Sequence, residues 1–247
     1  MFFTWPCITR QRRTVTKQSF LQYTRYGCSY KMFDFYKKQW FPYICPFFIY
    51  FATTQIITFL PQWEVHLFAA QAILCGLLLW IWRHNYHIEA INEITVKQIA
   101  ICACFGILEL STWWVLAHFN FITITQQTCP SSTIPITDII VKGICYGGFI
   151  VIIPIVSEIF WRSFMLRYLI DQNFQSIKLG SFQFFSFAMI IVLAAFTSNY
   201  IAAFALIALM QNILMVWQKN LLCCILTLAV VNGLLLITLF SGCGLPL

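Results

Sequence analysis

Residues 221–240 read LLCCILTLAVVNGLLLITLF, an apolar run without a single charged side chain. An α-helix rises about 1.5 Å per residue, so a helix over this run is about as long as the hydrocarbon core of a bilayer is thick, roughly 30 Å. Further apolar runs precede it at about 41–60, 65–82, 98–118, 138–158, 181–198 and 200–217. The sequence therefore predicts an all-α integral membrane protein with about seven transmembrane helices.

The composition of the chain leads to the same class. Of the 247 residues, 60% are hydrophobic and only 9% are charged. Soluble domains average about 45–50% apolar and about 25% charged residues. A soluble fold could not hide so much apolar surface, because surface area grows too fast relative to volume. The composition excludes an ordinary soluble domain, and the lipid bilayer is the partner that it implies.

The whole chain has a formal net charge of +7, and its basic residues gather in the first part of the sequence. A basic patch can bind anionic lipid or nucleic acid. We interpret it instead as a cytoplasmic tail that obeys the positive-inside rule, with no nucleic-acid partner. The basic residues at 83–97, 162–178 and 218–220 fall on the same side as this tail in a seven-span topology. The basic residues of the tail are Arg10, Arg12, Arg13, Lys17, Arg25, Lys31, Lys37 and Lys38.

The chain divides by composition into three regions. A basic cytosolic or interfacial tail covers 1–40, N-terminal transmembrane helices cover 41–137, and a C-terminal membrane core covers 138–240. The stretch 119–137 is a Thr-, Ser- and Pro-rich loop without Lys or Arg. His84 and His87 have a spacing that loosely resembles a metal cluster, but they stand in a basic loop where solvated side chains are expected. We predict neither a metal site nor a cofactor.

Three ionisable residues lie within predicted spans, where a buried charge is costly and marks a candidate site. Glu109 has no partner nearby in the sequence, so it is either a neutral carboxyl hydrogen-bonded between helices or part of a polar site. Lys142 stands near a helix end. Glu158 precedes Arg162 by one helical turn, which predicts an ion pair on one face, either functional or a helix-end salt bridge. The polar side chains of Gln211, Asn212 and Asn232 are expected to bond across helices.

Residues 157–171 read SEIFWRSFMLRYLID. They resemble the first motif of the CPBP intramembrane proteases, Glu-Glu-x-x-x-Arg, in the family of the CAAX prenyl endopeptidases and bacteriocin-processing enzymes. The continuation into Arg-Tyr-Leu-Ile-Asp and then Leu179-Gly180 is similar to the exosortase-associated branch. Residues 221–232 resemble the last motif of the family, in which a His stands four residues before an Asn. The resemblance covers roughly 139–240 and implies a CPBP-like helical bundle in a bacterial inner membrane.

The resemblance implies peptide hydrolysis inside the membrane. In that chemistry a carboxylate and a His activate water, while a second His and an Asn stabilise the oxyanion. Glu158, Arg162 and Asn232 are the motif positions that this sequence retains. Ser157 stands in place of the first Glu and Leu228 in place of the last-motif His, and the middle-motif His would fall near Thr197.

No His follows His118, so we expect a CPBP homologue that has lost catalysis. Alternatives are a scaffold or binding protein for membrane-embedded peptides or partner proteins, a protease with a rearranged site and, last, a transporter. The sequence names no particular substrate, partner or oligomeric state.

Two structural expectations follow from the resemblance and from the charge spacing. If the fourth and last spans pack as in that family, Glu158 and Asn232 approach the same cavity. Arg162→Ala is expected to destabilise the fold more than Arg167→Ala, because Arg167 should lie nearer water while Arg162 neutralises a buried carboxylate.

Overall fold

The computed structural model describes residues 38–86, 94–119, 136–197 and 200–240. Regular structure within these ranges is helical throughout, which confirms the predicted all-α class. The chain divides into two compact units, Met1–Phe41 and Pro42–Leu247. Both predicted membrane regions fall within the second unit, apart from Phe41. Most of the basic tail, His87 and most of the loop 119–137 lie outside the described residues.

The helices follow the predicted apolar runs closely. A capping box at Thr95 and Gln98 fixes the start of the third long helix, α5. In chain order the elements are α3 (Phe41–Phe59), η2 (Pro61–Trp63), α4 (Glu64–Ile81), η3 (Arg83–Asn85), α5 (Val96–His118), α6 (Ile136–Gly147), η5 (Gly148–Ile152), α7 (Ile153–Glu158), η6 (Ile159–Met165), α8 (Leu166–Tyr168), η7 (Phe174–Ser176), α9 (Phe184–Ala195), α10 (Ile201–Gln218) and α11 (Leu221–Phe240).

Among the described residues, six helical stretches are long and apolar enough to cross a membrane. The remaining predicted span, 181–198, contains the 12-residue helix α9. At about 1.5 Å per residue α9 is roughly 18 Å long, which by itself is short of the hydrocarbon core. α9 and α10 lie antiparallel, because Asn212 bonds to the backbone of Phe187 while Gly180 lies against Met215. The basic regions 162–178 and 218–220 therefore stay at the same end, whether or not α9 crosses completely.

The fourth predicted span, 138–158, is longer in the structure. Ile139–Tyr168 form one apolar helical stretch of 30 residues, built from α6, η5, α7, η6 and α8. The apolar run ends at 158, but the expected pairing of Glu158 with Arg162 one helical turn later already required the helix to continue, and it does so to Tyr168. Two of its segments, η5 and η6, are π-helical. Such segments inside α-helices are frequent at functional sites.

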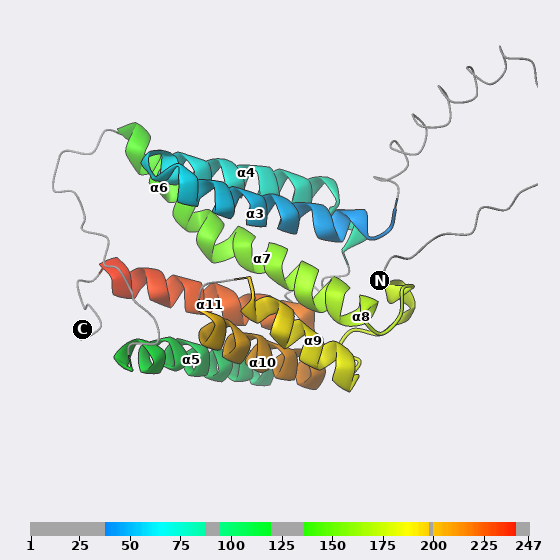
Figure 1. The fold of residues 1–247 in the computed structure, drawn as a ribbon. Coiled ribbons are helices and arrows are strands. Elements are labelled where there is room, and N and C mark those ends of the chain that lie inside the picture. Colours follow the sequence, from blue (N-terminus) through cyan, green and yellow to red (C-terminus); the bar gives the residue numbers. More distant parts are fainter. Residues whose placement is uncertain (1–37, 87–93, 120–135, 198–199, 241–247) are drawn as a thin grey trace, which may run out of the picture. The chain divides into compact units, whose positions relative to one another are not determined.

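The long helix packs against elements on two sides. Figure 1 shows it running between α3 and α4 and the group of α5, α10 and α11; α4 packs on α6 and η5, and α11 packs on α5 and α7. The Phe47 ring of α3 stacks on Phe160 of η6 with centroids 3.8 Å apart. The hydroxyl group of Tyr86, which follows η3, donates a hydrogen bond to the backbone oxygen of Pro42 in α3 at 2.8 Å. Burial raises the pKa of Tyr86, so its hydroxyl keeps the proton that it donates.

Candidate functional site

Glu158 and Arg162 form a buried ion pair inside the long helix. Nη1 of Arg162 lies 3.1 Å from Oε1 of Glu158, and the two residues are 4% and 0% exposed. The predicted pairing is confirmed, and its burial excludes a solvated salt bridge at a helix end. Removing one partner of such a pair leaves an uncompensated charge in a dry environment. The pair is therefore part of the core of the protein.

Other helices bring further polar side chains to this pair. Glu109 of α5 is completely buried and acts electrostatically on Glu158 and Arg162, and the amide of Gln211 on α10 faces it. The thiol of Cys224 on α11 is influenced by the same three charged groups and lies 3.8 Å from the backbone oxygen of Gln211. We call Glu109, Glu158, Arg162, Gln211 and Cys224 the buried polar cluster.

Several polar atoms of the buried polar cluster have no hydrogen-bond partner among the described residues. They are Oε1 and Oε2 of Glu109, Oε2 of Glu158, Nε of Arg162, and Oε1 and Nε2 of Gln211. The Gln211 amide lies close enough to Glu109 to interact with its carboxyl group, but no hydrogen bond of normal geometry joins the two side chains. Leaving such a group unpaired in a protein interior costs about 1–3 kcal/mol, and native proteins contain few of them. Their concentration at one place marks a candidate binding site.

The helices α5 and α11, which carry Glu109 and Cys224 of the buried polar cluster, pack closely against each other. A Cβ atom on Gly106 would lie 3.6 Å from Val230 and 3.7 Å from the backbone oxygen of Thr227. The hydroxyl of Thr227 donates to its own helix at Cys223 and lies 3.4 Å from the backbone oxygen of Cys102 on α5. A methyl group at position 106 would thus make ordinary van der Waals contacts with α11, so the two helices lie directly against each other. The approach carries Cys224 toward the carboxyl of Glu109.

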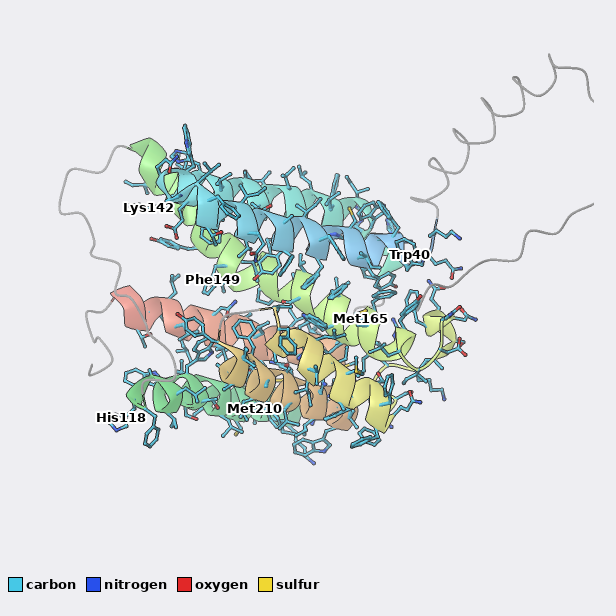
Figure 2. The ribbon with its side chains drawn as sticks, in the orientation of Figure 1. Trp40, His118, Lys142, Phe149, Met165 and Met210 are labelled. Carbon is cyan, nitrogen blue, oxygen red and sulfur yellow. The ribbon has the colours of Figure 1, made fainter. Side chains whose placement is uncertain are left out.

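Asn232 lies away from this cluster. Its side-chain amide donates to the backbone oxygen of Phe149 at 2.8 Å. Phe149 precedes Glu158 by nine residues, roughly 13 Å along a helix, so Asn232 and Glu158 are both buried but occupy different levels of the long helix. Figure 2 labels Phe149 and Met165, between which Glu158 lies in the sequence. The structure does not bring Asn232 to the ion pair; Cys224 of the same helix takes that place.

At the motif positions where this sequence departs from the family, the hydroxyl groups hydrogen-bond to nearby backbone oxygens. The hydroxyl of Ser157 donates to the backbone oxygen of Ile153 at 2.6 Å, and that of Thr197 donates to Ala194 at 2.6 Å. Leu228 is half-buried on α11, and Lys142 is half-buried on α6, near the opposite end of the long helix from Met165 (Figure 2). In the part of the chain that the structure describes, no three His, Cys, Asp or Glu side chains come together as a metal site requires.

Arg167 corrects one expectation from the sequence. It is 5% exposed rather than solvated. Its guanidinium donates to the backbone oxygen and the hydroxyl of Ser163 and to the backbone oxygen of Ile177, and it stands 5.3 Å over the ring of Phe174. Arg167 thereby ties the segment after the long helix back onto it. The loop that follows and Tyr43 of α3, which interacts with the guanidinium, account for its burial.

Sequence reasoning predicted the Glu158–Arg162 pair and singled out Glu109 and Gln211, but it did not bring the pair, Glu109 and Gln211 together. Cys224 was missed, because a Cys in an apolar helix reads as a small hydrophobe. The sequence signal for the buried polar cluster was that polar residues such as Glu109 and Gln211 are rare inside membrane spans.

Fold and site together define a polytopic helical membrane protein with a charged cluster in its core. Comparisons of the chain with protein-family models, with curated proteins and with solved structures found no match.

Proposed function

We propose that this chain is a non-cleaving homologue of the CPBP intramembrane proteases, which binds membrane-embedded peptides or partner proteins. In this proposal it resides in a bacterial inner membrane with its N-terminus in the cytoplasm. The observation that carries the proposal is that side chains of the retained motif are bonded to neighbouring groups of the same helix. Glu158 is bound to Arg162 at 3.1 Å, and the Ser157 hydroxyl is bound to its own helix at 2.6 Å.

A general base must reach the water molecule that it activates. Glu158 is 0% exposed, and the Arg162 guanidinium is already engaged with it. The Asn232 amide, which would stabilise an oxyanion in the family's chemistry, is used on Phe149. The last His of the sequence, His118, ends α5 and is exposed. The residues that would perform the chemistry are thus absent or held in structural contacts, which favours binding without cleavage.

Protein termini in the membrane fraction test this proposal. We would compare them by mass spectrometry in cells that carry the wild-type protein, Glu158→Gln or no protein. Glu64→Gln, a change of the same chemistry at the start of α4, serves as the matched control. The proposal predicts identical termini in all four samples. New peptide ends that appear both with the wild-type protein and with Glu64→Gln, but not with Glu158→Gln or without the protein, would contradict the proposal. They would show that Glu158 belongs to an active protease.

The binding part of the proposal needs a separate measurement. Photo-crosslinking in membranes, from an artificial amino acid placed at an exposed position of a span such as Val151, is expected to capture distinct partner proteins. The matched position is Ile107, which is exposed on α5. Capture of the same background proteins from both positions would contradict a dedicated binding surface on the long helix.

A further inference from the structure

The buried polar cluster holds more negative than positive charge. It contains the carboxyl groups of Glu109 and Glu158 and the single guanidinium of Arg162. Arg162 contacts Glu158 at 3.1 Å, so it compensates that carboxylate first. It is also the positive group that acts on Glu109. An ionised carboxylate without its own counter-charge is very costly in the interior of a membrane protein. Glu109 therefore requires a further positive charge.

The unpaired atoms around Glu109 indicate what kind of group supplies this charge. Four of them are oxygens, on Glu109, Glu158 and Gln211, and two are nitrogens, on Arg162 and Gln211. The set is thus rich in acceptors. Carboxyl and amide oxygens accept hydrogen bonds from a protonated group and are the ligands of hard cations. Gln211 is the independent pointer to a ligand, because it is 0% exposed, faces Glu109 and has neither polar atom paired.

Size and charge limit the occupant further. Glu109, Glu158 and Gln211 are 0% exposed and Arg162 is 4% exposed, so a peptide does not fit between them. A divalent ion would reverse the sign of the net charge, and Ca²⁺ and Mg²⁺ usually take six or more oxygen ligands. One positive charge on an atom-sized group balances the cluster.

We propose that Glu109 and Gln211, beside the Glu158–Arg162 pair, form a buried site for one positive charge, either a proton or a small monovalent cation such as Na⁺. An occupied site draws together α5, α7, η6 and α10, and it therefore stabilises the folded bundle. This inference is independent of the proposed loss of proteolysis, since no cleavage step enters it.

Few groups near Glu109 can titrate. The elements packed on α5 are α11 and α10. α11 contributes the Cys224 thiol and α10 contributes the neutral amide of Gln211, while Glu158 and Arg162 reach the site from the long helix. Because Arg162 compensates Glu158, the proton or cation on Glu109 is the charge that varies with conditions.

The melting temperature of the full-length protein in detergent tests the site. It would be measured by tryptophan fluorescence from about pH 5 to about pH 9 in choline, Na⁺ or K⁺ chloride at equal ionic strength. A carboxyl that holds a proton in the folded protein must release it as the pH rises, so the wild type should lose stability with rising pH in choline. We expect a decrease of at least about 3 °C. Glu109→Gln should be flat, and the control Glu64→Gln should follow the wild type.

The comparison of choline, Na⁺ and K⁺ chloride distinguishes a bound proton from a bound monovalent cation. Recovery of the wild-type melting temperature by Na⁺ or K⁺ at high pH, absent in Glu109→Gln, identifies a monovalent cation. The same pH dependence without any effect of Na⁺ or K⁺ identifies a proton. Equal pH and salt responses of wild type and Glu109→Gln would overturn the proposal. Failure of Glu109→Gln to fold in every salt would also overturn it, because the amide is the closest isostere of the neutral carboxyl group.

Discussion

The side-chain amide of Asn232 replaces a backbone donor that Phe149 lacks. In η5 the backbone N–H of Ile153 bonds to the oxygen of Gly148, five residues earlier, as in a π-helix. The next bond of this kind would join Phe149 to Pro154, but proline has no N–H group. The Asn232 amide of α11 donates to the Phe149 oxygen at 2.8 Å instead. Asn232 is thus a structural link between α11 and the long helix.

Replacing Asn232 should therefore destabilise the bundle in a way that depends on Pro154. Asn232→Leu is expected to lower the free energy of unfolding by about 1 kcal/mol, because hydrogen bonds between membrane helices are worth about 0.6 kcal/mol on average and up to about 1.7. In a Pro154→Ala background the Phe149 oxygen regains a backbone donor, and the same change should matter less. The four proteins would be compared by unfolding in detergent. An equal effect in both backgrounds would contradict this role of Asn232.

A second prediction concerns the contact between α4 and η5. A Cβ atom on Gly148 would collide with Cβ of Ala72 on α4, closer than non-bonded atoms approach. Gly148→Ala should therefore push the helices apart and cost about 1–3 kcal/mol. Gly147→Ala is the matched control, since a Cβ there meets nothing within 4 Å and alanine favours the helix. The melting temperatures of the two variants check this; a Gly148→Ala protein as stable as Gly147→Ala would exclude the close contact.

A third prediction replaces the expectation that Arg167 lies near water. Arg167→Lys keeps the charge but cannot bond to Ser163 and Ile177 with one planar fork. We expect a loss of about 1–2 kcal/mol of stability. Lys178→Ala, at an exposed position of the same loop, should stay within about 0.5 kcal/mol of the wild type. Chemical unfolding in detergent would separate the two variants, and equal stabilities would mean that the Arg167 contacts contribute nothing.

The helical class and most helix positions could be predicted because they depend on local hydrophobicity. The Glu158–Arg162 pair was equally accessible, since both residues stand on one helix at a spacing of four. The hydrophobic run alone ends at 158, so the full length of the helix to Tyr168 follows only when this pair and the apolar residues after it are counted. The length of α9 was overestimated, because residues 181–183, 196 and 197 of the apolar run lie outside the helix Phe184–Ala195.

The remaining features of the site depend on tertiary contacts. Glu109 of α5 meets Glu158 and Arg162 of the long helix through the packing of separate helices. The role of Asn232 depends on the π-helical bonding of η5, which no periodicity in the sequence indicates. Arg167 is buried by the loop that folds back over it and by Tyr43 of α3. These contacts join residues that are far apart in the chain, so spacing alone could not reveal them.

The central claim is that Glu158 and Arg162 form a buried structural pair, and a double-mutant cycle tests it most directly. The free energies of unfolding in detergent would be measured for the wild type, Glu158→Gln, Arg162→Gln and the double variant. We expect Arg162→Gln to cost about 3–5 kcal/mol because it strands a buried carboxylate, and the double variant to cost clearly less than the sum of the single changes. Additive effects, with a coupling energy below about 0.5 kcal/mol, would contradict the account.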